Sequence, residues 1–199
     1  NFDGLNAHYM TISVNAIGVD GKKTEIAEWG DNILVSARSE RSGHYDAKLS
    51  TATPTVNDPQ RLYAAFGDTS GAAPVVSGVV ALMLQANENL TWRDVQHILV
   101  KSAYLNDPGD ASWSTNAAGL AYSECYGFGA VNATSATLHA ETWQNVETME
   151  YKVVTTNILH AGSTTISVDT NIIIEHTALR MTFNSSCQFH LEISLTSPH

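Results

Sequence analysis

The segment that most constrains the fold of this chain is a run of small and apolar residues at 71–88, GAAPVVSGVVALMLQANE. It consists mostly of Ala, Val, Gly, Leu and Met, which predicts a helix buried on every side. Its small residues would let neighbouring backbone approach closely. Pro74 is expected in the first turn, where its missing N–H costs little. The run is therefore expected to be a core helix.

The composition fits a packed protein and excludes several classes. The chain has 199 residues, 43% hydrophobic and only 15% charged, with a formal net charge of −10. This acidity argues against a nucleic-acid partner, because such a surface needs clustered Lys and Arg. The apolar run near 75–84 is far shorter than the ~20 residues of a membrane span, so no span is predicted. Cys125 and Cys187 form no CxxC pair; they could make one bridge or stay reduced.

Strands and loops are expected before the helix. The β-branched runs at 9–14 and 33–35 predict two short strands. Residues 36–60 are polar and lack periodicity, which predicts loops with one hairpin.

Two more helices are expected after it. Thr91 is a good N-cap, and Asp94 three residues later predicts a capping box with Asp in place of Glu. This helix should end near Ala103, and a shorter helix is expected at 131–143. Strands combined with helices in this way indicate an α/β unit over residues 1–143.

The hydrophobic period changes to two after Trp143, which predicts a second, all-β unit over residues 144–199. Its unpaired apolar edge predicts poor solubility in isolation. The expected strands are 151–155, 164–168, 172–174, 178–183 and 191–195.

The candidate chemistry lies in GDTSGAAP at 67–74. Ser70 would lie at or just before the start of the long helix, where N–H groups and the macrodipole favour negative charge. This position suits a nucleophilic serine, whose tetrahedral intermediate carries an oxyanion. The alternative is that Ser70 is only an N-cap, because serine is among the commonest caps.

A longer string favours the nucleophile. Residues 67–103 combine Asp-Thr-Ser, a small-residue helix and the continuation NLTWRDVQHIL at 89–99. This region resembles the serine motif of the subtilisin-like serine proteases. The continuation narrows the resemblance to the kexin/furin-like branch, the proprotein convertases and their bacterial relatives. TNAAG at 115–119 and YGFGAVNA at 126–133 resemble the same branch.

This resemblance implies a subtilisin-like parallel sheet with flanking helices, of which residues 1–143 would be the C-terminal portion. Residues 144–199 would be the N-terminal portion of the P domain, the jelly-roll-like β-sandwich that follows the catalytic domain in this branch; LEISLTSP at 191–198 resembles one of its strands. Some 50 residues are too few for the complete sandwich, so the resemblance implies a partial P domain. The implied activity is that of a secreted or extracytoplasmic serine endopeptidase. It would hydrolyse protein or peptide substrates after basic residues.

Three site residues carry over from the family pattern. Ser70 matches the nucleophile that attacks the scissile carbonyl. Asp3, in Asn-x-Asp-Gly, resembles the acidic residue of the specificity pocket that receives an arginine. Glu28 resembles an acidic calcium ligand beneath that pocket, so calcium is the implied cofactor. Taken alone, Asp3 and Glu28 could equally be solvated loop carboxylates.

The chain departs from the family pattern in two respects. Where the family has glycine before Thr-Ser, this chain has Asp68, which would be accommodated with strain or would depress activity. The catalytic Asp, His and oxyanion Asn should lie upstream of Asn1, in the remainder of the catalytic domain, since His8 and His44 lack the His-Gly-Thr context. A fragment of this kind would be inactive alone. The alternative is a catalytically inactive homologue that acts as a structural or binding module.

Overall fold

The computed structural model describes residues 4–39, 49–52, 62–156, 165–168 and 174–178. The chain divides into two compact units, Asn1–Val146 and Glu147–His199. Each is described by itself.

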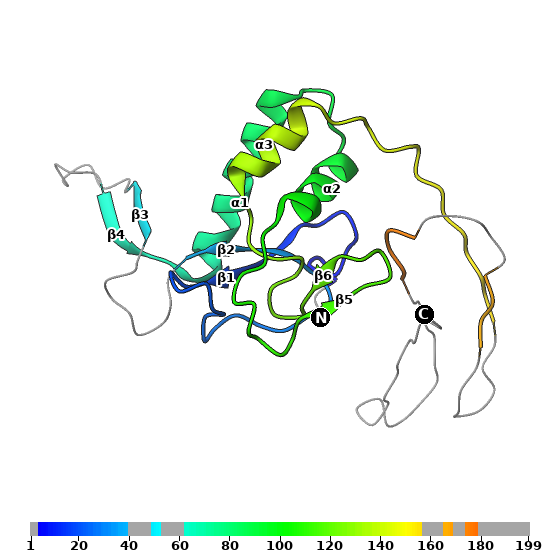
Figure 1. The fold of residues 1–199 in the computed structure, drawn as a ribbon, viewed down its shortest axis with the longest axis horizontal. Coiled ribbons are helices and arrows are strands. Elements are labelled where there is room, and N and C mark those ends of the chain that lie inside the picture. The colour runs from blue at the N-terminus through cyan, green and yellow to red at the C-terminus, as the bar shows by residue number, and fades with distance from the viewer. Residues whose placement is uncertain (1–3, 40–48, 53–61, 157–164, 169–173, 179–199) are drawn as a thin grey trace. The chain divides into compact units, whose positions relative to one another are not determined.

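A parallel pair of strands, β1 (Ser13–Ile17) and β2 (Ile33–Arg38), forms the sheet of the first unit (Figure 1). Both strands are mostly buried, and Val35 and Ala37 have no exposed surface. Because the strands are parallel, their carboxyl ends lie at the same edge of the sheet. The strand predicted at 33–35 is confirmed and extends to Arg38.

The strand predicted at 9–14 starts too early. The chain there forms turns instead, in which the His8 N–H donates to the Leu5 carbonyl at 3.3 Å and the Thr11 N–H donates to the His8 carbonyl at 2.8 Å. Backbone groups used in these turns are not available to a strand ladder. The strand therefore begins only at Ser13.

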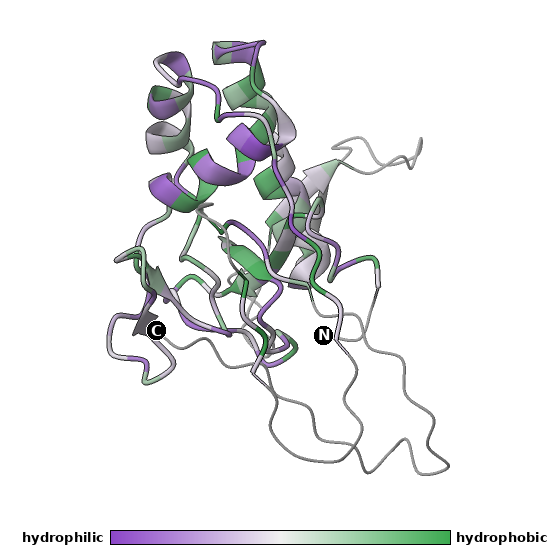
Figure 2. Ribbon diagram, turned by 90° about the vertical axis from the view of Figure 1, so that its right-hand side faces the viewer, coloured by the Kyte–Doolittle hydropathy of each residue, from purple (hydrophilic) through white to green (hydrophobic). Residues whose placement is uncertain are grey.

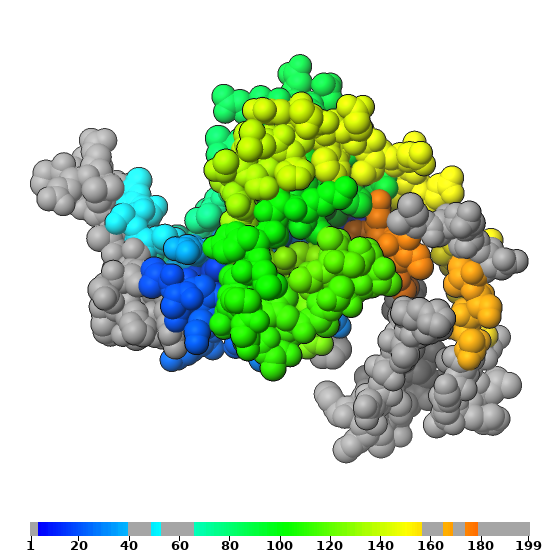
Figure 3. Space-filling model, viewed as in Figure 1, coloured from blue at the N-terminus to red at the C-terminus, as the bar shows by residue number. Residues whose placement is uncertain are grey.

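The long helix α1 (Asp68–Ala86) packs against β1, β2 and the helix α3 (Ala133–Glu141). Figure 1 shows α1 and α3 side by side, and in Figure 3 the side chains of α3 cover part of α1. The buried positions of α1 are Gly71, Ala72, Val76, Val79 and Met83. Its other side is open, with Leu82 47% exposed. The prediction of a helix buried on every side is wrong. Among the described residues, β1, β2 and α3 cover one part of the surface of α1, and the rest of its surface is exposed.

The helix begins at Asp68, three residues earlier than the run at 71–88 predicts. Pro74 therefore lies in the second turn, not in the first, which corrects the prediction that its missing N–H costs little. In a regular helix the N–H of residue 74 would bond the Ser70 carbonyl, four residues earlier. Proline cannot donate this bond, so it loosens the helix beside Ser70.

By length and composition alone α1 could cross a membrane, although its longest apolar run is short. The core helix of a soluble domain satisfies the same criterion. Its packing against both strands and α3 identifies α1 as the core helix of the first unit.

The helix α2 (Trp92–Ser102) begins with the predicted capping box. The Asp94 N–H donates to the Thr91 hydroxyl at 3.3 Å, and the Thr91 N–H donates to the Asp94 carboxylate at 2.7 Å. The predicted third helix is also confirmed as α3, and the side chain of its N-cap Asn132 accepts the Ser135 N–H at 3.0 Å.

Two antiparallel pairs complete the first unit as described. The first joins β3 (Leu49–Ala52) to β4 (Leu62–Phe66); of the hairpin predicted within 36–60, only this first strand lies in the predicted range. The second joins β5 (Ser114–Thr115) to β6 (Ala121–Tyr122). Strands of two residues carry no readable periodicity, and the sequence did not predict them.

The core of the first unit consists of two groups of buried side chains. The larger group lies among β1, β2 and the three helices, and the smaller contains Ile17, Cys125, Tyr126 and Ala130. In Figure 2 the strands are largely hydrophobic, whereas hydrophilic stretches lie on helices and loops. Cys125 is a buried free thiol whose pKa is raised by burial. Cys187 lies outside the described residues.

The second unit is described only at residues 147–156, 165–168 and 174–178, and none of these stretches contains a helix or strand. The strand predicted at 151–155 is therefore wrong for the described chain. The other four predicted strands lie partly or wholly outside the described residues. The jelly-roll-like architecture of this unit stays a prediction.

Asp94 fastens the end of the first unit to α2. Its buried carboxylate accepts hydrogen bonds from the Trp143 indole at 2.9 Å, the Asn145 amide at 3.0 Å and the Val146 N–H at 2.8 Å. Burial alone would raise the pKa of Asp94, but the hydrogen bonds from Thr91, Val146 and Trp143 lower it below its ordinary value. Asp94 thus holds residues from two distant parts of the chain.

We predict that Asp94→Ala lowers the free energy of unfolding by about 2 kcal/mol, because it leaves several part-buried hydrogen-bond donors without their acceptor. Since the folded pKa is depressed, the stabilisation is present at neutral pH and is lost as the pH falls below about 4. Urea titrations at pH 7 and pH 3 measure both effects. The exposed Asp31, as Asp31→Ala, is the control and should change stability by less than about 0.5 kcal/mol. Equal losses in the two variants would contradict the prediction.

Candidate active site

Ser70 is the third residue of α1, and its side chain is exposed. The N-cap is Gly67, which has no side chain, so Ser70 does not act as the N-cap. The first intrahelical hydrogen bond runs from the Gly71 N–H to the Gly67 carbonyl at 2.9 Å. The N–H groups of residues 68–70 precede this bond and have no acceptor within the helix. The hydroxyl therefore lies among backbone donors at the positive end of the helix dipole.

The start of α1 lies at the carboxyl edge of the β1–β2 sheet. Ser39, the residue after β2, donates its hydroxyl to the Asp68 carbonyl at 2.6 Å. The Ser39 N–H also donates to the carbonyl of Ile17, the last residue of β1, at 2.8 Å. Ligand sites of α/β proteins lie at this edge, so Ser70 is placed where a substrate would bind.

Asp68 adopts a backbone conformation that favours glycine. Its φ is +61°, in the left-handed region, and its side chain is exposed. For a residue with a Cβ this region costs about 1–2 kcal/mol, less for Asp and Asn than for most others. Of the two expectations for this departure, the structure shows accommodation with strain.

Glycine is required at position 71, directly after Ser70, for a steric reason. A Cβ at this position would lie 2.6 Å from the Ser39 Oγ and 2.8 Å from the Leu49 Cδ1. Both separations are shorter than real Cβ contacts. The first turn of α1, which contains Ser70, is therefore packed directly against Ser39 and against β3.

The other two predicted site residues are Asp3 and Glu28. Asp3 lies outside the described residues. Glu28 lies in the connection between β1 and β2; its side chain is exposed and its carbonyl accepts the Asn15 amide at 2.9 Å. Among the described residues, no group of three or more His, Cys, Asp or Glu side chains could hold a metal ion. Calcium at Glu28 stays a prediction, and no chemical step is derived through it.

Three described histidines of the first unit have partners other than Ser70. The His8 ring accepts the Met10 N–H at 3.2 Å, His97 stacks on Trp143, and the His139 ring lies 2.8 Å from the Ser135 carbonyl. His44, also considered from the sequence, lies outside the described residues. The contacts of these three histidines therefore give no evidence of a general base at Ser70.

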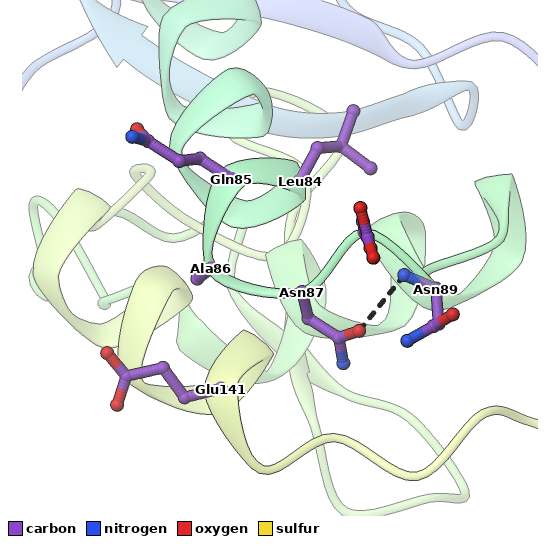
Figure 4. A pocket seen from close by; sticks show the side chains of 7 residues that line it. Leu84, Gln85, Ala86, Asn87, Asn89 and Glu141 are labelled. Atoms are coloured by element: carbon purple, nitrogen blue, oxygen red, sulfur yellow. Dashed lines mark hydrogen bonds between the residues drawn. The ribbon is translucent and has the colours of Figure 1, made fainter.

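A polar hollow of about 630 Å³ lies at the opposite end of α1 (Figure 4). Its lining includes Gln85, Asn87 and Glu141, and the Asn89 N–H donates to the Asn87 side chain at 3.1 Å. At 1.5 Å per helical residue, Ser70 and Asn87 are about 25 Å apart along the axis. The hollow is thus no part of the serine site.

An apolar groove of about 270 Å³ lies nearer to the serine. It lies between α1 on one side and β1 with the residues just before β1 on the other. Ala73, which lines the groove, is three residues after Ser70. Its lining residues are Ile12, Val14, Ala73, Val76, Ser77 and Val80. Ser70 is not among the residues that line this groove.

Comparison with known proteins identifies the family to which the chain belongs. Residues 6–129 match the sequence model of the subtilase family, Peptidase_S8. The chain belongs to the subtilase family. The match contains both strands of the sheet, Ser70 and all of α1 and α2.

Among curated relatives, this subtilase chain is similar to kexins and proprotein convertases. It is 30% identical to Protease KEX1 of Kluyveromyces lactis over all of this chain and 27% of the relative. It is 31% identical to Proprotein convertase subtilisin/kexin type 5 of Homo sapiens over 98% of this chain and 11% of the relative. The predicted kexin/furin-like resemblance is confirmed. The chain spans only about a quarter or less of these relatives.

A solved structure confirms the fold of the subtilase unit. The serine protease of Aeromonas sobria superposes with a TM-score of 0.64 at 24% identity, over 72% of this chain and 31% of that one. At this identity the likeness concerns the fold alone. It supports the predicted subtilisin-like α/β architecture.

The sequence predicted Ser70 as the nucleophile, which stays a prediction, but gave no sign of the hydrogen bond from Ser39 to the start of α1. The two residues are 31 positions apart, and a single serine after a strand is an ordinary residue. Its role depends on the parallel pairing that brings the end of β2 to the start of α1. The repeated small residues after Ser70 were the available signal that something packs closely there.

The backbone strain at Asp68 predicts an inverted order of substitutions. In a helix interior, glycine is less stable than alanine by about 1 kcal/mol. At φ +61° we expect the reverse, with Asp68→Gly more stable than Asp68→Ala by about 1 kcal/mol. Both variants remove the carboxylate, so their difference isolates the backbone. Urea unfolding measures it.

The control is Ala73→Gly, at an exposed helical position of α1. It should show the ordinary order, with a loss of about 1 kcal/mol. If alanine were the more stable residue at both positions, the strain at Asp68 would be refuted.

Proposed function

We propose that this chain carries the nucleophile of a serine endopeptidase of the kexin/furin-like branch, which hydrolyses peptide bonds after basic residues. The observation that carries the proposal is the exposed Ser70 hydroxyl in the first turn of α1, at the carboxyl edge of the sheet and inside the subtilase match.

The position of Ser70 supports nucleophilic attack on a peptide carbonyl. As the tetrahedral intermediate forms, its oxyanion would accept a hydrogen bond from the Ser70 N–H, which precedes the first intrahelical bond. The helix dipole adds favourable potential at the same point. Because these donors are fixed by the helix, they need no reorganisation during the reaction.

The general base is proposed to come from the rest of the enzyme. A histidine would take the Ser70 proton and return it to the leaving amine, while an aspartate holds that histidine in position. His8, His97 and His139 have other partners, and the chain spans 27% of the Kluyveromyces lactis relative. We therefore place His, Asp and the oxyanion Asn in the remaining part of the protein.

Specificity for basic residues is proposed to depend on Asp3. A buried carboxylate at the bottom of a specificity pocket pairs with a substrate guanidinium through charge-assisted hydrogen bonds. The net charge of −10 would also raise the local concentration of cationic substrates. Calcium held in part by Glu28, residues 144–199 as the start of a P domain, and an extracytoplasmic location belong to the same proposal.

The second candidate function is that of an inactive homologue with a structural or binding role. The observation that favours it is Asp68, a charged and strained residue two positions before Ser70. Labelling of the active serine decides between the two functions.

We predict that a fluorophosphonate probe labels the protein expressed from its full coding sequence, and that Ser70→Ala abolishes labelling. The probe phosphonylates only a serine that is activated by a base: the serine oxygen bonds to phosphorus, and fluoride leaves. In-gel fluorescence and peptide mass mapping of the adduct measure the outcome.

The matched control is Ser77→Ala, another exposed serine on α1. It should label at the wild-type rate. Labelling that survives Ser70→Ala would refute the assignment of the nucleophile. A folded wild type that does not label would favour the inactive homologue.

We predict that Asp3→Asn lowers kcat/KM for peptides with arginine before the scissile bond by about 100-fold, through loss of the ion pair with the substrate. Activity toward an uncharged residue at that position should change little. Steady-state assays with matched fluorogenic peptides measure the ratio. Asp31→Asn, which removes one exposed carboxylate elsewhere, should leave the ratio within about twofold. Equal losses for both peptides would contradict a role in specificity.

A further inference from the structure

We propose that Ser39 is a positioning residue for catalysis: its hydroxyl holds the strained turn that presents Ser70. The inference rests on the proposed function, since positioning has meaning only if Ser70 reacts. It concerns the contact between the end of β2 and the start of α1.

Ser39 is itself firmly placed. It is 2% exposed, and its N–H donates to the Ile17 carbonyl at 2.8 Å, which continues the β1–β2 pairing by one residue. A side chain fixed in this way can hold a neighbouring segment at small entropic cost. Ser39 therefore connects the sheet edge to the residue that accepts its hydroxyl hydrogen bond.

The hydroxyl contacts the strained residue itself. The Ser39 Oγ donates to the Asp68 carbonyl at 2.6 Å, and Asp68 has a φ of +61°. Such a conformation persists only where its surroundings fix it. The bonded carbonyl belongs to the peptide group that joins Asp68 to Thr69. Its orientation therefore sets the direction in which the chain continues to Ser70.

The other side of the turn is shaped to accept the same hydroxyl. A Cβ at Gly71 would lie 2.6 Å from the Ser39 Oγ, so only glycine leaves room for it. Ser39 thus contacts the chain both before and after Ser70, at Asp68 and at Gly71. A hydroxyl placed on both sides of the nucleophile restricts its backbone more than one ordinary hydrogen bond would.

The test compares Ser39→Ala in two backgrounds, on the protein expressed from its full coding sequence. With Asp68 present, we expect kcat and the rate of fluorophosphonate labelling to fall about tenfold or more, with KM within about twofold, because reacting groups become misplaced. In the Asp68→Gly background the same substitution should cost about threefold or less, since glycine adopts φ +61° without strain. This non-additivity is a readout that a merely structural hydrogen bond would not give.

Ser36→Ala is the matched control. Ser36 is a buried serine on β2 whose hydroxyl donates to the Tyr126 carbonyl at 3.1 Å, away from α1. It should lower the melting temperature about as much as Ser39→Ala does. After correction for the folded fraction, its kcat and labelling rate should stay within about twofold of the wild type.

Two results would overturn the inference while the proposed function stands: wild-type labelling rates in Ser39→Ala, or the same loss in both backgrounds. A folded wild type that does not label would overturn the proposed function and this inference together. A selective, Asp68-dependent loss of kcat and labelling supports both.

Discussion

The parallel pairing of β1 with β2 is the constraint on which the rest of the first unit depends. It brings Ile17 and Ser39 together at one edge, and it forms the surface on which α1 packs through its smallest residues. Gly71 and Ala72 are buried there because a larger side chain would push the helix away from the strands. The helix start, and with it Ser70, is therefore located by the sheet and not by its own loop.

Features with local causes could be predicted from the sequence. The capping box of Thr91 and Asp94 needs only residues three positions apart, so its chemistry is visible in the chain itself. Features with distant causes could not. The strand predicted at 9–14 begins at Ser13 because hydrogen-bonded turns occupy the residues before it. The run at 71–88 was composed like a fully buried helix, but burial depends on which other segments surround it, and composition does not specify them.

In the candidate site, too, some features could be predicted from the sequence and others could not. Ser70 could be predicted because its neighbours in the chain form a known sequence motif, and the family match contains that motif. The strain at Asp68 was foreseeable from the family glycine, since a missing glycine identifies a backbone position with special dihedral angles. Ser39 was not foreseeable, because its effect depends on a hydrogen bond across 29 residues of chain. A residue that is proposed to act in this way can be identified only when the pairing of the strands is known.

Asp68 brings three effects to one place, and they differ in sign. Its φ of +61° costs conformational energy. Its carboxylate in the first turn favours the helix through the dipole, by about 0.3–1 kcal/mol. In the proposed reaction, the same negative charge would oppose the oxyanion that forms at this helix end. For folding, the favourable interaction with the dipole offsets part of the conformational cost. For the proposed reaction, both the strain and the charge of Asp68 are unfavourable, so the hydrogen bond from Ser39 that holds the strained turn would matter more with aspartate at position 68 than with glycine.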